Sequence, residues 1–226
     1  MKILEVVGLT CVVNGVALLD ALSFTLEEGE ILALCGPTDA GKTACLRCLA
    51  GSLPATSGRL IFDGREVTGM GPLELARHGL VRTGELPTPP WPLTALQAVV
   101  LALRWPRLGA FAAVLAKWPD PRGRARARAL LERVGLGAEV AVRRDDLSPD
   151  GLERVGLAQA LALRPRLLLL DEPLGHLPPD DLRAMAALIT EIRAGGVSVV
   201  VTEREPSVAE VVADRVAVLD HGALIA

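Results

Sequence analysis

The stretch GPTDAGKT, residues 36–43, follows the apolar run ILALC and opens a segment rich in Ala, Leu and Cys. A glycine loop between a strand and a helix is typical of a phosphate-binding loop, because its backbone N–H groups and the helix N-terminus cradle a polyphosphate. In this pattern Lys42 reaches the terminal phosphates and the Thr43 hydroxyl ligates Mg²⁺. The residues expected around the phosphates are Gly36, Pro37, Thr38, Asp39, Ala40, Gly41, Lys42, Thr43 and Ala44.

The composition indicates a cytoplasmic protein. A length of 226 residues fits one domain, or one core with an inserted lobe. Mean hydropathy is +0.38, yet the longest apolar run, 108–116, is too short to span a membrane. Met1 leads directly into a strand-like segment without a signal-peptide cleavage site. A net charge of −3 argues against nucleic-acid binding, and the Arg-rich run at 122–133 is interpreted as a solvated helix face.

The four cysteines also fit a reducing compartment. Cys45 and Cys48 are spaced as C-x-x-C within the helix that follows the phosphate loop, and no second pair completes a zinc set. The other two cysteines are Cys11 and Cys35. The helical spacing and apolar neighbours of Cys45 and Cys48 fit small buried side chains, with a redox role as the alternative.

The order of the predicted elements indicates an α/β fold with a mainly parallel sheet after a β-rich start. A proline-dense segment at 83–93 is interpreted as a linker or functional loop. Residues 94–139 have helical periodicity, with breaks expected at Trp105-Pro106, at 119–121 and at Gly135. The predicted strands are 3–7, 23–26, 31–35, 59–62, 167–170, 197–202 and 215–219, and the predicted helices are 42–50, 73–78, 151–163, 180–194 and 207–212.

Two acidic residues follow the buried strand pattern LLLL. Asp171 and Glu172 stand at its carboxyl end, where ligands of α/β sheets bind. In phosphoryl transfer Asp171 would hold Mg²⁺, and Glu172 would orient or deprotonate the attacking water. The alternative is an acidic pair that caps the turn before Pro173. The phosphate loop upstream favours the catalytic interpretation.

With these motifs in place the chain resembles the ATPase subunit of an ABC transporter. The segment LSPDGLERVGLAQAL, residues 147–161, lies where that family has its LSGGQ signature. The segment GLVRTGELP, from Gly79, and the helical stretch LRWPRLGAFAAVLAKW look most like the branched-chain amino acid importer subgroup. The chain ends soon after Gly222, earlier than is usual in that subgroup, which leaves a lost tail contact or a truncated chain as open alternatives.

The resemblance implies a P-loop NTPase (RecA-like) core with an antiparallel β subdomain and an inserted α-helical lobe. It divides residues 1–226 into a nucleotide-binding core, 1–92 and 141–226, and a lobe, 93–140. It also implies Mg-ATP hydrolysis, a second ABC ATPase chain as partner, and transmembrane permease subunits. The expected location is therefore the cytoplasmic face of the plasma membrane, with attachment through the permease.

The signature segment departs from the family pattern. Ser148 is retained, as expected for a contact with the nucleotide of the partner chain, but Pro149, Asp150 and Gly151 replace the two glycines and the glutamine. Proline removes an N–H donor, and an aspartate near a phosphate is repulsive. Ser-Pro-Asp is a favourable helix start, however. We therefore expect this segment to cap the helix well but to make a weaker contact with the nucleotide across the dimer.

Two other nucleotide contacts are altered. Glu85 replaces the glutamine of the loop that joins core and lobe, and it is expected to ligate Mg²⁺ with a changed charge. Arg204 stands at the position of the switch histidine. It either contacts a phosphate oxygen or pairs with Glu203 or Glu205, and pairing is favoured.

Other departures predict weak ATP binding and an uncertain dimer contact. The adenine-stacking region offers Val13, beside Val12, in place of an aromatic ring. Asp39 adds negative charge to the phosphate loop, and Ala44 lacks a second hydroxyl. His176 and Pro178 occupy the loop where subunits of the family touch.

Two hypotheses follow from these residues. The first is an ATP-hydrolysing subunit of an importer, and the second is a degenerate subunit that binds nucleotide or a partner while another chain supplies turnover. Trp91 is the preferred anchor for the membrane subunit, with packing into the lobe as the alternative.

Overall fold

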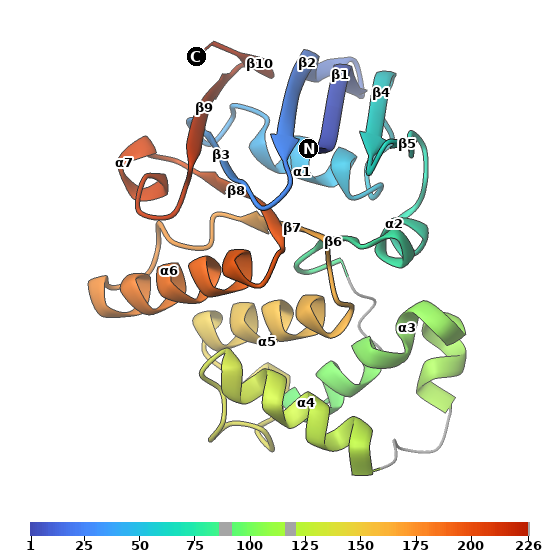
Figure 1. The fold of residues 1–226 in the computed structure, drawn as a ribbon, viewed down its shortest axis with the longest axis vertical. Coiled ribbons are helices and arrows are strands. Elements are labelled where there is room, and N and C mark those ends of the chain that lie inside the picture. The colour runs from blue at the N-terminus through green and yellow to red at the C-terminus, as the bar shows by residue number, and fades with distance from the viewer. Residues whose placement is uncertain (86–91, 116–120, 226) are drawn as a thin grey trace.

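The computed structural model describes residues 1–85, 92–115 and 121–225. Its first part is an antiparallel sheet in the order β2-β1-β4-β5 (Figure 1). The strands are β1 (Lys2–Val13), β2 (Val16–Glu27), β4 (Ser57–Phe62) and β5 (Arg65–Glu66).

The first two strands are longer than predicted because they form one hairpin. Val13 pairs with Val16 across the dipeptide Asn14-Gly15, and both turn residues have positive φ, as a type I′ turn requires. Irregularities in the β1 register interrupt the strict alternation on which the shorter prediction of 3–7 rested. The pairing of the two strands therefore extends them well beyond the apolar segments.

The second sheet has the order β10-β9-β3-β8-β7-β6 and is parallel except for β10. It confirms the predicted mainly parallel α/β core. The strands are β3 (Ile31–Cys35), β6 (Leu80–Arg82), β7 (Leu167–Asp171), β8 (Ser198–Glu203), β9 (Arg215–Asp220) and β10 (Ala223–Leu224). The strand β6 was not predicted, because three residues carry too little periodicity to be recognised.

Two hydrophobic cores lie on opposite faces of the parallel sheet. In β7, Leu168 and Leu170 belong to one core while Leu167 and Leu169 belong to the other, so the fully apolar strand serves both faces. The helix α1 (Lys42–Leu49) packs into the core that the parallel sheet shares with the antiparallel sheet.

All four cysteines are buried and free, which agrees with the expectation for Cys45 and Cys48. Burial raises the pKa of the Cys35 thiol to about 11 and that of Cys48 to about 12, so both favour the neutral thiol. The C-x-x-C pair is therefore part of the packing of α1.

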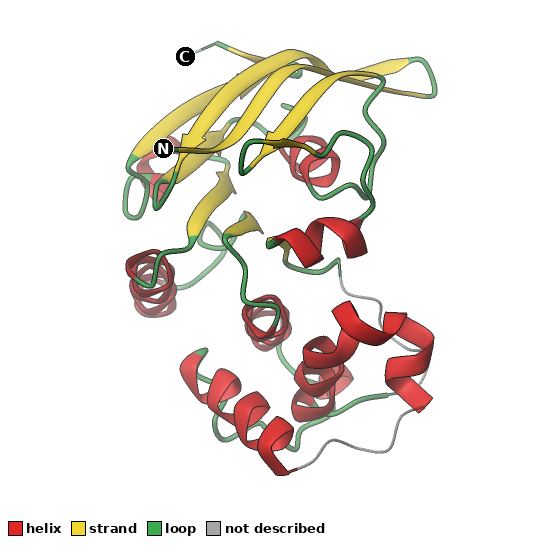
Figure 2. Cartoon of the chain, turned by 45° about the vertical axis from the view of Figure 1, so that its right-hand side comes forward, coloured by secondary structure: helices red, strands yellow, loops and turns green. Residues whose placement is uncertain are grey.

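The helices α3 to α7 contribute to the core on the other face of the parallel sheet, while α2 contributes to both cores. The helices α3, α4 and α5 pack together away from the antiparallel sheet (Figure 1). The predicted break at Trp105-Pro106 is wrong, since α3 continues through Pro106; a proline in a helix interior removes one hydrogen bond and bends the helix without having to end it. Figure 2 shows α3 changing direction along its length. The helices are α2 (Pro72–His78), α3 (Ala95–Leu115), α4 (Pro121–Arg133), α5 (Pro149–Ala162), α6 (Pro179–Ala194) and α7 (Pro206–Ala209), with a 3₁₀ turn at Arg144–Asp146.

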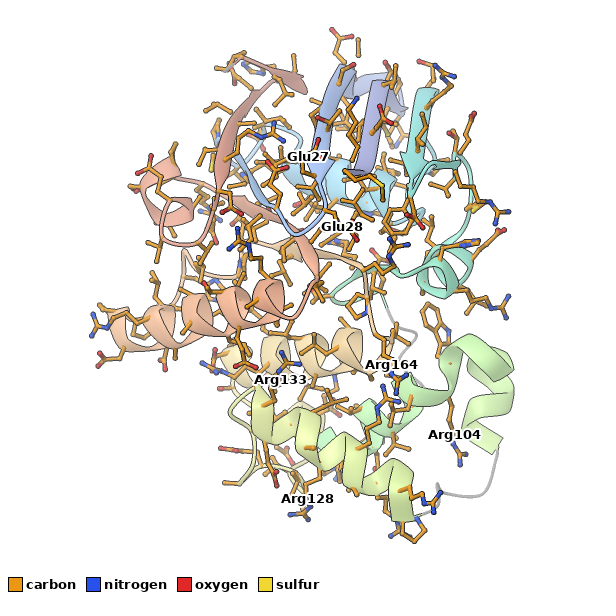
Figure 3. All side chains as sticks on the ribbon, viewed as in Figure 1. Glu27, Glu28, Arg104, Arg128, Arg133 and Arg164 are labelled. Carbon is orange, nitrogen blue, oxygen red and sulfur yellow. The ribbon has the colours of Figure 1, made fainter. Side chains whose placement is uncertain are left out.

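The Arg-rich run forms most of α4, and its arginines are exposed, as expected for a solvated helix face. Arg128 lies on the outer side of α4, while Arg133 pairs with Glu191 of α6 at 2.9 Å (Figure 3). Across the described ranges, no helix combines the length and apolar character that a membrane crossing requires.

Candidate nucleotide-binding site

The phosphate loop joins the carboxyl end of β3 to α1, as the sequence predicts. Two of its glycines are required by close packing. A Cβ atom on Gly36 would lie 2.2 Å from the Leu219 carbonyl oxygen, and one on Gly41 would lie 2.5 Å from the Leu18 carbonyl oxygen. Both glycines also have φ values that other residues avoid, +155° and +95°. The loop conformation is therefore fixed by the strands packed around it.

Lys42 is buried, and its ammonium group points back into the loop. Its Nζ donates hydrogen bonds to the carbonyl oxygens of Gly36, at 2.7 Å, and Pro37, at 2.8 Å. It also lies 3.2 Å from the Oε1 atom of Glu172, although only 2% of the lysine side chain is exposed. The three N–H donors of the ammonium group thus have three partners, and the site holds its own cation beside Glu172.

Asp171 is held through both of its carboxylate oxygens. Oδ1 accepts hydrogen bonds from the hydroxyls of Thr202, at 2.7 Å, and Thr43, at 3.3 Å. Oδ2 accepts from the guanidinium of Arg82 at 2.9 Å. Neither Thr202 nor Arg82 was predicted from the sequence as a site residue. A charged residue at the end of an apolar strand was the available signal for Arg82.

Glu172 follows Asp171 with a backbone that few non-glycine residues adopt, at φ +47°. Its N–H donates to the backbone oxygen and the hydroxyl of Thr202, both at 3.1 Å, which fixes this conformation against β8. Its side chain lies between Lys42 and Arg204. The tertiary structure therefore places this carboxylate between two cations.

Arg204 forms an ion pair, as expected, but its partner is Glu172 and not the predicted Glu203 or Glu205. The Nε atom of Arg204 donates to Glu172 Oε2 at 3.0 Å. Glu203 cannot pair with the exposed Arg204 because its own side chain is only 1% exposed and points inward from β8. There it accepts a hydrogen bond from the N–H of Leu174 at 2.8 Å. Burial raises the pKa of the Glu203 carboxyl, and the nearby Glu172 carboxylate raises it further.

Glu85 lies near this group and has two donors of its own. Its Oε1 atom accepts hydrogen bonds from the Ser52 hydroxyl, at 2.8 Å, and from Arg82. Arg82 thus joins Glu85 to Asp171. Ser52, which follows α1, was not recognised from the sequence.

Ser148 caps α5, as predicted. Its hydroxyl accepts the N–H of Gly151 at 3.1 Å, and Pro149 is the first residue of the helix. Asp150 is paired with Arg154 one turn later, at 2.7 Å.

Ser148 and Val13 were predicted for contacts that a single chain without nucleotide does not include, across the dimer and to adenine, and both stay predictions. Val13 is partly buried beside the core between the two sheets. Pro37, Thr38 and Asp39 are exposed at the tip of the loop, and Ala40 is buried beneath it.

His176 and Trp91 were predicted to lie where partner subunits bind. His176 lies 3.2 Å from Glu153 of α5, so the loop after Glu172 contacts that helix. Trp105 is 7% exposed and packs in the core, whereas Trp91, the preferred anchor, falls outside the described residues.

A cavity of about 290 Å³ adjoins Asp171 on the side of α5. It is lined by Thr83, Gly84 and Leu170 from the sheet side and by Leu152 and Gly156 from the helix.

The oxygen atoms around Thr43 suit Mg²⁺. A hydroxyl and a carboxylate, 3.3 Å apart, converge at the start of α1, and both are ligand types that Mg²⁺ prefers. The described residues contain no group of three or more His, Cys, Asp or Glu side chains arranged for a metal ion. A bound Mg²⁺ would therefore share its coordination with phosphates and water.

Residues 19–175 match the family model described as ABC transporter. This match includes the phosphate loop, the cap of α5 and the acidic pair after β7. The chain belongs to the ABC transporter family.

Relatives within the family are about one-third identical to this chain over the aligned residues. The methionine import ATP-binding protein MetN of Rhizobium johnstonii is 36% identical over 98% of the chain. The high-affinity branched-chain amino acid transport ATP-binding protein BraF of Pseudomonas aeruginosa is 31% identical over 99% of the chain and 90% of its own length. The chain spans about 60% of the length of MetN.

Solved structures of the family share the fold. The ADP conformation of MJ1267, an ATP-binding cassette of an ABC transporter, has a TM-score of 0.87 at 24% identity and matches 100% of this chain and 90% of its own. The dimeric MJ0796 cassette bound to ADP and phosphate has a TM-score of 0.83 at 22% identity, covering 99% of this chain and 97% of its own.

Proposed function

We propose that this chain is the ATP-binding subunit of an ABC importer, and that it binds and hydrolyses Mg-ATP at the loop of residues 36–44. The observation that carries the proposal is the meeting of Lys42 with Glu172 at 3.2 Å, next to Thr43 and Asp171 at 3.3 Å. These four side chains come from two distant segments of the sequence, and a lysine, a hydroxyl and two carboxylates are the set that phosphoryl transfer needs.

Each residue has a distinct role in the proposal. The loop N–H groups and Lys42 bind the phosphates, while Thr43 and Asp171 are the ligands of Mg²⁺. When bound, the metal ion neutralises phosphate charge. Glu172 orients the attacking water and accepts its proton, for which its anchored backbone supplies a fixed direction. Glu85 lies at the edge of the site as a further candidate ligand, held by Arg82 and Ser52.

Turnover by the chain alone is proposed to be slow. The Nε atom of Arg204 donates a hydrogen bond to Glu172 Oε2, so that oxygen already has a partner when the attacking water has to be oriented. The cap formed by Ser148 replaces a glycine-rich signature, which weakens the contact expected with a nucleotide on the partner. These features favour an unequal dimer, in which a second ABC ATPase chain supplies the stronger site.

The transported solute is proposed to be an amino acid. The names of MetN and BraF support this class. The chain would work on the cytoplasmic face of the plasma membrane through permease subunits, as one ATP-binding domain whose lobe comprises residues 93–140.

The test is ATP turnover by the purified chain, with and without a co-expressed partner. We expect slow phosphate release alone and a further loss of about 100-fold or more in Glu172→Gln, because an amide cannot accept the proton. The exposed Glu191→Gln serves as a matched control and should retain wild-type turnover. If nucleotide does not bind, or if Glu172→Gln hydrolyses ATP like the wild type, the proposal is wrong.

A further inference from the structure

Arg82 lies between the carboxylates of Asp171, which contacts Thr43, and Glu85. It is the last residue of β6, the strand next to β7 in the sheet. One terminal nitrogen, Nη2, donates to Asp171 Oδ2 at 2.9 Å, and the other, Nη1, donates to Glu85 Oε1. A planar guanidinium is suited to such a double contact because its donors form a rigid fork.

The three side chains are largely withdrawn from solvent. Arg82 is 14% exposed, Glu85 is 18% exposed and Asp171 is 22% exposed. Charges in such a setting are screened less than charges on the surface. The Nε atom of Arg82 is buried and has no hydrogen-bond partner. The arginine therefore hydrogen-bonds to both carboxylates but leaves its Nε donor without a partner. An unsatisfied buried donor lowers the stability of the folded state.

The two carboxylate oxygens of Asp171 have different partners. Oδ1 faces the hydroxyls of Thr43 and Thr202, whereas Oδ2 faces Arg82. Arg82 thus leaves the oxygen beside Thr43 available to a metal ion. Thr202 maintains the orientation of the carboxylate independently of Arg82. The larger contribution of Arg82 is its charge, which offsets the negative charge that an incoming divalent cation would meet.

The same guanidinium holds Glu85 together with the Ser52 hydroxyl. Without Arg82, two carboxylates would lie at one edge of the nucleotide site without a shared counter-charge. Such a pair attracts divalent cations more strongly than one carboxylate does.

We propose that Arg82 is a positioning residue that acts as the resident counter-cation of Asp171 and Glu85, and that it thereby sets the Mg²⁺ concentration needed for nucleotide binding. The inference rests on the proposed function, because it assigns the metal to the Asp171 edge of the same site.

The experiment measures binding of a fluorescent ATP analogue to the full chain, first in EDTA and then over a Mg²⁺ titration. In Arg82→Met we expect the Mg²⁺ concentration for half-maximal enhancement of binding to fall by about tenfold, because one positive charge is removed near the metal. Arg82→Lys keeps the charge and should stay close to the wild type. Arg82→Met combined with Glu85→Gln removes one charge of each sign and should also return toward the wild-type value.

A second variant keeps the inference testable if Arg82→Met does not fold, as judged by circular dichroism and thermal melting. Glu85→Gln retains the arginine and removes a negative charge, so its Mg²⁺ requirement should rise. An unchanged or higher Mg²⁺ requirement in a folded Arg82→Met, or an unchanged one in Glu85→Gln, would overturn the counter-cation role. Failure of the wild type to bind the analogue at any Mg²⁺ concentration would instead overturn the proposed function on which the inference rests.

Discussion

The Nε atom of Arg204 donates a hydrogen bond to Glu172 Oε2 at 3.0 Å, while Glu172 Oε1 lies 3.2 Å from the ammonium group of Lys42. One carboxylate thus separates a buried cation from an exposed one. Glu172 is the residue proposed to accept a proton from water, and its two oxygens already have Arg204 and Lys42 as partners before a water molecule arrives. The contact with Arg204 is therefore a specific structural reason to expect slow turnover.

Arg204→His should raise kcat at saturating ATP by about tenfold, because Glu172 Oε2 loses the guanidinium hydrogen bond and can accept one from the attacking water. Thermal stability should change little, because Arg204 is 64% exposed and exposed ion pairs contribute about 0–1 kcal/mol. Steady-state kinetics and thermal melting measure the two effects. Arg183→His, at an exposed ion pair on α6, is the matched control. An unchanged or lower kcat would contradict the prediction.

Lys42→Met should weaken nucleotide binding by at least about tenfold, because the loop loses its only lysine beside the phosphates. It should also lower the free energy of unfolding by about 1–3 kcal/mol, since two carbonyl oxygens and Glu172 lose a buried donor. Titration calorimetry and urea unfolding measure these changes. The exposed Lys2→Met should alter neither property. Full stability in Lys42→Met would show that the buried contacts contribute nothing net.

Glu203→Gln should become progressively more stable than the wild type as pH rises. Burial raises the pKa of Glu203 in the folded state, so the native protein binds this proton more tightly than the unfolded chain does. Wild-type stability is therefore lost as pH rises from the ordinary glutamate pKa, about 4.3, through the raised folded value, and glutamine has no such loss.

Urea unfolding of both proteins between pH 5 and pH 8 tests this prediction, with Glu191→Gln as a control for the change in net charge. A stability difference between Glu203→Gln and the wild type that is constant, or that shrinks with rising pH, is the opposing result.

Ser148→Ala should destabilise the chain by about 1 kcal/mol, because the N–H of Gly151 loses the acceptor that caps α5. Ser148→Asp preserves a capping oxygen and should keep most of the stability. The free energy of unfolding of both variants, measured by chemical denaturation, reports the contribution of Ser148 to the helix cap, apart from any contact it makes across a dimer. Equal losses in the two variants would argue that the hydroxyl does more than cap the helix.

The sequence by itself determined the local elements of the site. The apolar run before Gly36, the glycines of the loop and the lysine at position 42 specify a strand, a tight phosphate loop and a helix within a dozen residues. The LLLL run before Asp171 likewise specifies a strand that is buried on both faces, because all of its residues are apolar, with acidic residues at its carboxyl end. Ser148 and Pro149 likewise determine a helix start from neighbouring residues.

Only the tertiary structure decided which of these groups meet. Arg82 reaches Asp171 across 89 positions of sequence because β6 and β7 are neighbours in the sheet, and Arg204 reaches Glu172 because β7 and β8 are neighbours. Periodicity reports which face of a strand is buried, but it carries no information on strand order. Strand order brings Arg82 and Arg204 to the candidate site. The motifs of that site could therefore be predicted from the sequence, whereas the two cations that pair with its carboxylates could not.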